Sequence, residues 1–315
     1  MSNVSSMTTH FKPDRLESNP SLAELITRSA SQQTYYTIHL LADRDRIAEA
    51  YRTYAYFRWV DDQLDEDGMN QSERLQFIER QQRLIENCYG GEWPRTASEE
   101  ESMLVELIRS EREERSGLGA YIHNMMAVMA FDAERRGRLI FADELRKYTH
   151  HLAVAVTEAM HYFIGHGCKS PQDQTRYLAV RAAHITHMLR DTQDDIEAGY
   201  FNIPCEVVKA CRIDPCDVQS EAYRKWIKDR VGLARACFRA GRHYLARVEN
   251  LRCRMAGFAY TARFESVLSA IECDDYYLRP AYPECKNWAS CLSMAWLAIS
   301  RAFMPQRAGD VLHAG

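Results

Sequence analysis

Two pairs of aspartates carry the clearest chemical signal in this sequence. Asp61 and Asp65 are four residues apart, and so are Asp191 and Asp195. On an α-helix this spacing puts two carboxylates on one face, one turn apart, where like charges repel each other. Two interpretations are open for each pair: a solvated acidic face without a ligand, or a site at which a bound cation offsets the repulsion.

If the helices that carry the two pairs face one another across a cavity, four carboxylates converge. Hard oxygen ligands of this kind select Mg²⁺, or Mn²⁺, over zinc, and Mg²⁺ commonly shares its coordination with a phosphate group. A diphosphate is therefore the expected ligand. The metal neutralises charge on the leaving diphosphate, so that the carbon–oxygen bond can ionise and leave a carbocation.

Arginines accompany both aspartate pairs. Arg58 lies one turn before Asp61, and Arg190 is adjacent to Asp191. The planar guanidinium group suits phosphate oxygens, which favours a role in diphosphate binding. The alternative is an ion pair with the neighbouring aspartates, which contributes little at a surface.

Two histidines precede the second pair. His184, His187 and Asp191 follow the spacing i, i+3 and i+7, which puts them on one helix face. They could hold zinc or iron, bond a diphosphate or metal-bound water, or move a proton when a cation intermediate is quenched. The remaining interpretation is neutral histidines bonded inside a helical bundle.

Two other classes of protein stay open. Glu158 and His161 form an ExxH pattern, as in carboxylate-bridged di-iron bundles, but that architecture needs two such motifs and the sequence holds one. A catalytically idle helical binding protein is the other class. Replacing Asp61 and Asp191 by Asn would test it.

The composition limits the choice of partners and compartment. The 315 residues carry a formal net charge of −4, which gives no basic field for nucleic acid. The ten cysteines form no CxxC pair, which favours reduced thiols in a cytoplasmic protein.

No apolar run is long enough to cross a membrane. Residues 288–304, interrupted by Arg301, predict a terminal packing helix, with peripheral membrane contact as the alternative.

The elements that position these residues are helices. Apolar residues recur at three- and four-residue spacing over long intervals, and strand-like alternation is almost absent, so we predict an all-α bundle. We expect one domain over residues 21–305 between a flexible tail at 1–20 and a C-terminal tail at 306–315. Ser72 is expected to cap the second long helix. The expected long helices cover 43–65, 72–89, 99–115, 118–136, 142–165, 172–198, 220–251 and 255–274.

The two acidic segments resemble the squalene/phytoene synthase family of head-to-head prenyl synthases. YAYFRWVDDQLDE (54–66) is similar to the family's first aspartate-rich motif, and MLRDTQDDIEAGYFNIP (188–204) is similar to its second. FDAERRGRLIFADELRKYTHHLAVAVTE (131–158) resembles a third family segment. Weaker similarity runs from about Ser29 to Phe303.

The resemblance implies an isoprenoid-synthase-type helical bundle with a central cavity, and a Mg²⁺-dependent prenyltransferase. In the family, one allylic prenyl diphosphate ionises. The cation then couples to a second prenyl diphosphate, which forms a cyclopropyl diphosphate. Farnesyl or geranylgeranyl diphosphate is the expected substrate. By resemblance, the metal ligands are Asp61, Asp65, Asp191 and Asp195, supported by Asp62 and Asp194, and the diphosphate is held by Arg58, Tyr54, Arg190, Asp132 and Arg136.

The chain departs from the family pattern near the second motif. His184 and His187 stand where the family usually has glutamine and a metal-contacting asparagine, and Tyr200 replaces an arginine. The helix segment 151–157 is bulkier than the family's glycine-rich version. We therefore expect an altered pocket. Prenyl transfer to another acceptor, such as an aromatic ring, and terpene cyclisation stay open as alternatives.

Overall fold

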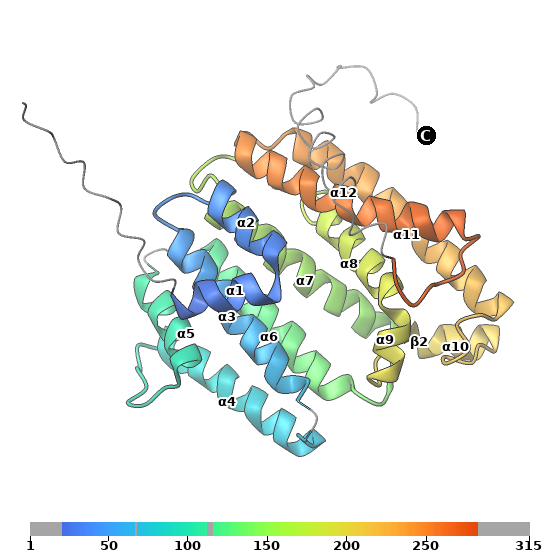
Figure 1. The fold of residues 1–315 in the computed structure, drawn as a ribbon, viewed down its shortest axis with the longest axis horizontal. Coiled ribbons are helices and arrows are strands. Elements are labelled where there is room, and N and C mark those ends of the chain that lie inside the picture. The colour runs from blue at the N-terminus through green and yellow to red at the C-terminus, as the bar shows by residue number, and fades with distance from the viewer. Residues whose placement is uncertain (1–20, 67, 112–115, 283–315) are drawn as a thin grey trace, which may run out of the picture.

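The computed structural model describes residues 21–66, 68–111 and 116–282, and these are helical almost throughout (Figure 1). The all-α prediction is confirmed. The predicted tails and the segment 288–304 lie outside the described residues. The elements are α1 (Leu22–Ala30), α2 (Gln32–Leu41), α3 (Ile47–Leu64), α4 (Gln71–Tyr89), α5 (Glu99–Ser110), α6 (Gly117–Arg135), β1 (Leu139–Ile140), α7 (Ala142–Phe163), α8 (Leu178–Arg190), α9 (Thr192–Glu197), β2 (Phe201–Pro204), α10 (Cys205–Cys211), α11 (Glu221–Ala246) and α12 (Leu251–Cys273).

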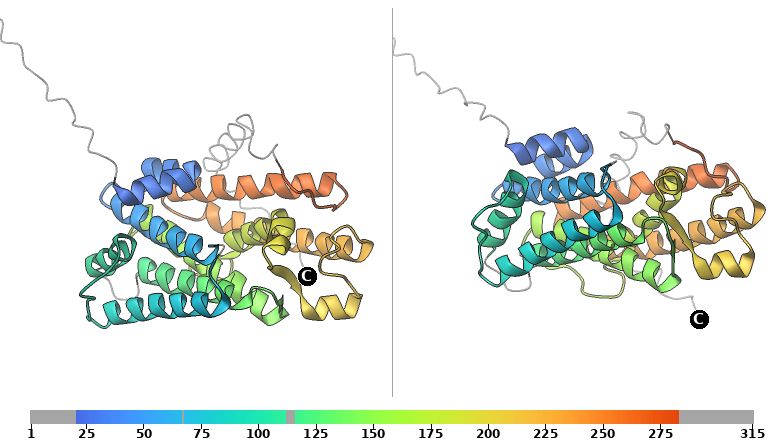
Figure 2. Two further views of the ribbon diagram at one scale, coloured as in Figure 1. Left: turned by 60° about the horizontal axis from the view of Figure 1, so that its bottom comes forward. Right: turned by 90° about the horizontal axis from the view of Figure 1, so that it is seen from below.

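Neighbouring long helices pack side by side across the molecule. α4 contacts α6, α6 contacts α7, α7 contacts α8, and α8 contacts both α11 and α12. The short helices α1 and α2 lie on the α3 side of the molecule, and α1 packs on α3 (Figure 2). α7 and α8 therefore occupy the middle of the bundle, between the half that carries Asp61 and the half built by α11 and α12 (Figure 1).

Local hydrogen bonds explain where several helices begin. The side chain of Asn70 accepts from the backbone of Glu73, whose side chain accepts from the Asn70 backbone, which is a capping box at the start of α4. The prediction that Ser72 caps this helix is wrong, because Asn70 takes that role. The predicted start of α3 at Asp43 is also wrong. The Asp43 carboxylate instead accepts hydrogen bonds of 3.0 and 2.9 Å from the backbone N–H groups of Gly165 and His166.

The predicted helix over 172–198 is wrong in its extent and continuity. α8 begins at Leu178 and ends at Arg190, and α9 begins at Thr192. The Thr192 hydroxyl bonds the carbonyl oxygens of Met188 (2.7 Å) and Leu189 (3.2 Å). Such back-bonding bends helices, which accounts for the interruption at Asp191.

The chain also turns earlier than predicted near residue 250. α11 ends at Ala246, and Asn250 caps α12 by accepting a 3.0 Å hydrogen bond from the backbone N–H of Cys253. Asparagine satisfies a free N–H group at a helix start, so α12 begins at Leu251 and not at 255.

A short parallel strand pair ties the end of α6 to the segment after α9. β1 pairs with β2, and the backbone N–H of Gly137 donates a 2.8 Å hydrogen bond to the carbonyl of Gly199. Sequence alternation did not predict these strands, which contain too few residues for a periodic pattern. The pairing places Asn202 beside the last turn of α6.

Candidate active site

The first aspartate pair lies at the C-terminal end of α3. Asp61 is in the last turn, Asp65 is the C-cap residue, and the backbone N–H of Asp65 donates a 3.0 Å hydrogen bond to the Asp61 carbonyl. The predicted one-turn spacing is therefore present. Asp62 is exposed and pairs with Arg58.

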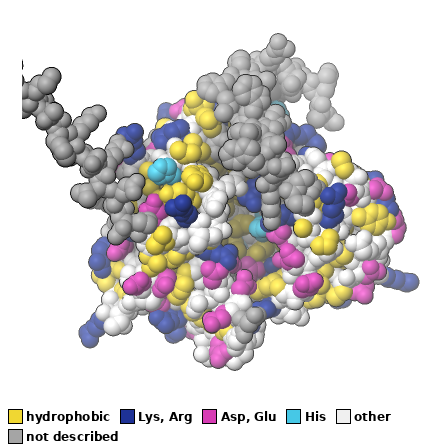
Figure 3. Space-filling model, in the orientation of Figure 1, with side chains coloured by type: hydrophobic (Ala, Val, Ile, Leu, Met, Phe, Trp, Pro, Cys, Tyr) yellow, Lys and Arg dark blue, Asp and Glu magenta, His cyan; other side chains and the backbone are white. Residues whose placement is uncertain are grey.

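The second pair bridges the junction of α8 and α9. The backbone N–H of Asp195 donates a 2.8 Å hydrogen bond to the Asp191 carbonyl, so the helical relationship survives the interruption. Asp194 is exposed. In Figure 3, acidic side chains gather around a hollow near the middle of one face of the molecule.

A chain of hydrogen bonds connects Asp195 to α6 and α7. The Asn202 amide donates to Asp195 (2.6 Å) and accepts from Arg135 (2.9 Å). Arg135 also donates to Asp132 (2.7 Å), which accepts a 2.8 Å hydrogen bond from the Tyr148 hydroxyl. Asp132 is thus brought to the second pair through two intermediate side chains. No role for Tyr148, Arg135 or Asn202 was predicted from the sequence. The three-residue spacing of Asp132 and Arg135 is the only local signal for any of them.

The electrostatics show negative charge that the protein does not neutralise. Burial, with repulsion from Asp65 and Asp132, raises the pKa of Asp61 to about 6 against the attraction of Arg58. Burial and repulsion from Asp191 and Asp132 raise the pKa of Asp195 to about 7. The charge of Asp132 therefore acts on one carboxylate of each pair.

The two flanking arginines are paired with their own aspartates. Arg58 lies 3.1 Å from Asp61 and also contacts Asp62. Arg190 donates two hydrogen bonds, of 2.5 and 2.6 Å, to the carboxylate of Asp191. Burial acts to raise the pKa of Asp191, but the bonds from Arg190 and His187 hold it well below its ordinary value.

The other predicted diphosphate ligands border the same region. Burial raises the pKa of the Tyr54 hydroxyl, and Tyr54 lies close enough to Arg58 and Asp61 for their charges to act on it. Arg136 donates a 2.9 Å hydrogen bond to the carbonyl of Ala198. Its Nη1 atom is buried and has no hydrogen-bond partner in the described part of the chain.

The two histidines have different surroundings. His187 has a side chain 48% exposed, and its Nε2 lies 2.8 Å from Oδ2 of Asp191. His184 is 6% exposed, neither of its ring nitrogens has a hydrogen-bond partner among the described residues, and its ring centre lies 5.1 Å from that of Tyr148. Burial, with the charges of His187 and Arg135, lowers the pKa of His184 to about 3, so this imidazole is neutral.

These oxygen donors suit a hard divalent cation whose coordination shell is completed by a ligand. Among the described residues, no group of three or more His, Cys, Asp or Glu side chains is arranged to hold a metal by itself. Mg²⁺ is usually bound by one or two carboxylates together with water and substrate phosphates, without an all-protein cage. Two aspartate faces with raised pKa values at Asp61 and Asp195 fit that mode of binding.

The ExxH pattern belongs to a separate polar network. Glu158 accepts two hydrogen bonds of 2.7 and 2.8 Å from Arg176, and His161 lies 2.6 Å from the Tyr244 hydroxyl. Among the described residues, no group of three or more His, Cys, Asp or Glu side chains is arranged to hold a metal around this motif, so the structure gives no support to the di-iron interpretation.

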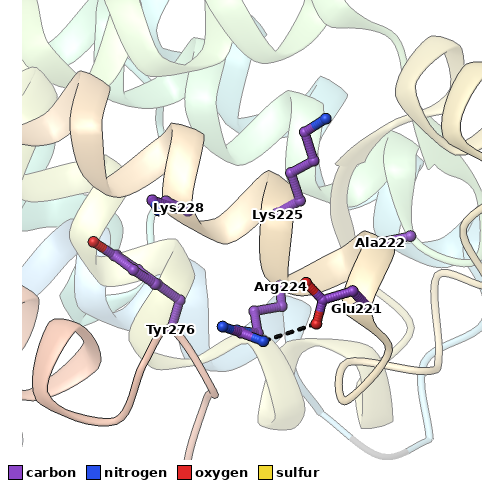
Figure 4. A pocket seen from close by; sticks show the side chains of 6 residues that line it. All are labelled: Glu221, Ala222, Arg224, Lys225, Lys228 and Tyr276. Carbon is purple, nitrogen blue, oxygen red and sulfur yellow. Dashed lines mark hydrogen bonds and ion pairs between the residues drawn. The ribbon is translucent and has the colours of Figure 1, made fainter.

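A surface pocket lies at the start of α11 (Figure 4). It is lined by Glu221, Ala222, Arg224, Lys225, Lys228 and Tyr276, and none of these is a predicted site residue. Arg224 pairs with Glu221 at 2.8 Å, as drawn in Figure 4, and the ammonium of Lys228 lies 5.4 Å from the centre of the Tyr276 ring.

Within the part of the chain that the structure describes, no helix has the length and apolar character needed to cross a membrane.

Comparisons with known proteins identify similar sequences and folds. The family model for squalene/phytoene synthase matches residues 27–288. The crystal structure of squalene synthase HpnC from Alicyclobacillus acidocaldarius is similar with a TM-score of 0.63 and 18% identity, over 82% of this chain and 94% of that chain. A dehydrosqualene synthase solved in complex with a ligand is similar with a TM-score of 0.67 and 16% identity, over 88% of this chain and 94% of that chain. No curated protein sequence matches the chain.

Proposed function

Because the chain belongs to the squalene/phytoene synthase family of prenyltransferases, we propose that it ionises an allylic prenyl diphosphate with the help of Mg²⁺. The cation is then coupled to a second prenyl diphosphate. Farnesyl and geranylgeranyl diphosphate are the proposed substrates. Mn²⁺ is the alternative metal.

Asp61, Asp65, Asp191 and Asp195 are the proposed metal ligands. Mg²⁺, when bound, supplies positive charge to the departing diphosphate. The residues proposed to hold the diphosphate are Arg58, Tyr54, Arg190, Asp132 and Arg136. Arg58 and Arg190 can exchange an aspartate oxygen for a phosphate oxygen once a metal neutralises the aspartates. Arg136 already presents a buried Nη1 atom that lacks an acceptor.

The observation that carries this proposal is the electrostatic link between the two aspartate pairs. Asp132 raises the pKa values of both Asp61 and Asp195, although these residues lie on different helices. A divalent cation would offset their shared excess of negative charge and could then bind a diphosphate. Repulsion among carboxylates on α3, α6 and α9 supports a shared cation site over separate solvated acidic faces.

The test is incubation of the purified chain with farnesyl or geranylgeranyl diphosphate, with Mg²⁺ or with a chelator. We expect a product twice the length of the substrate, as a hydrocarbon or a cyclopropyl diphosphate, only when Mg²⁺ is present. Asp61→Asn and Asp191→Asn should abolish it. Asp45→Asn, at an exposed position on the chain before α3, is the matched control and should leave it unchanged.

Other outcomes would redirect the proposal. Monomeric terpenes would indicate cyclisation. Turnover only after addition of an aromatic or other non-isoprenoid acceptor would indicate transfer to that acceptor. If ligand binding is the same in wild type and both variants and no protein shows turnover, the chain is a binding protein and not an enzyme.

A further inference from the structure

Arg230 occupies an unusual place for a charged side chain. It lies on α11 three residues after Ile227 and four residues before Ala234, and both of these are fully buried. Arg230 therefore belongs to the inner stripe of α11, which packs on α8. Burial and the charge of Arg181 lower its pKa to about 10.

α8 and α11 run in opposite directions. Arg230 therefore lies between the level of the aspartates and the N-terminal end of α8. Tyr223 is in the first turn of α11, and burial together with the charge of Asp195 raises its pKa. Near the other end of α11, a Cβ atom on Gly241 would lie 2.5 Å from the backbone nitrogen of Ala179. Arg230 is between these two levels, two helical turns from Tyr223, which is about 10 Å along the axis.

Arg181 is only partly buried. The residues of α8 from Ala179 to Arg190 are buried except Arg181, His187 and Arg190. At about 100° per residue, Arg181 lies on a different side of α8 from His187 and Arg190, and it shares its side with His184, three residues further along. Arg181 is about 15 Å along the axis from Asp191, since an α-helix rises 1.5 Å per residue.

His184 lies one turn beyond Arg181 and completes the cluster. Both of its ring nitrogens are buried and lack hydrogen-bond partners among the residues that the structure describes, and the charge of Arg230 acts on its ring. A neutral imidazole has one N–H donor and one acceptor. Leaving both unbonded inside a protein costs free energy unless a ligand bonds them.

Within the described residues, neither Arg181 nor Arg230 has an acidic partner. Among residues 21–66, 68–111 and 116–282, no hydrogen bond or ion pair is formed by the side chain of Arg181 or Arg230, and the Arg230 guanidinium lies only against the Trp226 ring, at 6.0 Å. This contrasts with Arg176 and Arg135, which are buried and are bonded to carboxylates. In the described part of the chain, two guanidinium groups whose charges repel, together with an unbonded histidine, are therefore donors without an acceptor.

We propose that Arg181, His184 and Arg230 bind an oxyanion, a phosphate or a carboxylate, that is carried by the second reactant of this enzyme. Paired guanidinium groups match the geometry of both anions, and the imidazole N–H adds a third donor. A hydrocarbon chain in this place would leave all three groups without an acceptor. The assignment of the anion to a reactant rests on the proposed function, but the anion site itself does not.

The site can be tested without turnover. The full chain is heated in the presence of a chelator, with and without inorganic phosphate, pyrophosphate or benzoate, and the midpoint of unfolding is measured. With Mg²⁺ removed, the aspartate cluster repels anions, so a rise in the midpoint reports the arginine site. The relative response to pyrophosphate and benzoate distinguishes a diphosphate from a carboxylate ligand.

Arg230→Met and Arg181→Met should each weaken the anion response by about tenfold or more, because each removes a charged two-point contact. In the absence of anions, both variants should unfold at the same or a higher temperature than wild type, since each removes a partly buried unpaired charge. Arg239→Met, at an exposed position of the same helix, is the matched control. If Arg230→Met does not fold, Arg230→Lys, which keeps the charge but not the fork, should show the weakened response.

The absence of an anion response in wild type, or an equal response in all variants, would overturn the proposal. Asp191→Asn, which tests the proposed function, should retain the anion response, so the two proposals fail separately. In the turnover assay, Arg230→Met should lower the ratio of coupled product to released diphosphate. An unchanged ratio would show that the anion does not belong to the second reactant.

Discussion

The Tyr148 hydroxyl donates a 2.8 Å hydrogen bond to Oδ2 of Asp132, while Oδ1 of the same carboxylate accepts from Arg135 at 2.7 Å. This arrangement joins the middle of α7 to the end of α6. Through Arg135 and Asn202 it continues to Asp195. The acidic centre therefore depends on residues that lie outside the two aspartate-rich motifs.

Tyr148→Phe should weaken both the fold and the site. It removes a hydrogen bond to a charged group, which is worth about 1.5–3 kcal/mol in the free energy of unfolding. Product formation from farnesyl diphosphate should slow on the order of tenfold to a hundredfold, because a displaced site residue costs about that much. Urea denaturation and product assays check the two effects. Tyr36→Phe, at a side chain 53% exposed, should change neither.

Asn202→Asp should shift the pH dependence of Mg²⁺ binding to higher pH. The new carboxylate replaces a hydrogen-bond donor to Asp195, whose pKa is already raised to about 7. A further negative charge raises this pKa again, so the metal-binding carboxylate form appears only at higher pH. Titration with Mg²⁺ at several pH values measures the shift. An unchanged profile would show that Asp195 does not bind the metal.

His161 should make the fold sensitive to acid. Burial, with the charge of Arg176, lowers the pKa of His161 to about 4, below the value of about 6.5 expected in the unfolded chain. The native state thus favours the neutral ring, and its contribution to stability is present above about pH 6.5 and is lost as the pH falls towards 4. His161→Gln should flatten the decline in urea midpoint over this range. His123→Gln, at an exposed position, serves as the control.

Glu158→Gln should destabilise the end of the bundle away from the aspartates. Arg176 is 5% exposed, and two of its nitrogens bond Glu158. Removing one partner of such a pair leaves a buried charge uncompensated and costs about 3–5 kcal/mol. Asp143→Asn breaks an exposed pair with Lys147 and should have little effect. Equal urea midpoints for the two variants would contradict this prediction.

Gly241→Ala should force α8 and α11 apart. The added Cβ would meet backbone and side-chain atoms of Ala179 at 2.5–2.7 Å, and overpacking of this kind costs about 1–3 kcal/mol. Gly232→Ala on the same helix meets nothing within 4 Å. It should stabilise the protein by about 0.5–1 kcal/mol through the better helix propensity of alanine. Opposite changes in the two denaturation midpoints are the expected result.

The sequence by itself determined the helical class and the neighbours of each residue along its own helix. The one-turn spacing of Asp61 with Asp65 and of Asp191 with Asp195 was predicted, because a helix places residues four apart on one face. The helix ends were less accurate, as at Asp43 and Asp191. There, side-chain hydrogen bonds to Gly165, His166 and Met188 outweigh the local apolar pattern.

Only the tertiary structure decided which helices share a centre. Arg135 meets Asn202 across 67 residues, and His161 meets Tyr244 across 83 residues, and no spacing rule relates positions so far apart. The structure likewise separated His184 from His187, which one helix face had grouped together. His187 bonds Asp191 near solvent, whereas His184 lies buried beside Tyr148 and the arginines, because the packing of α7 and α11 on α8 covers one and not the other.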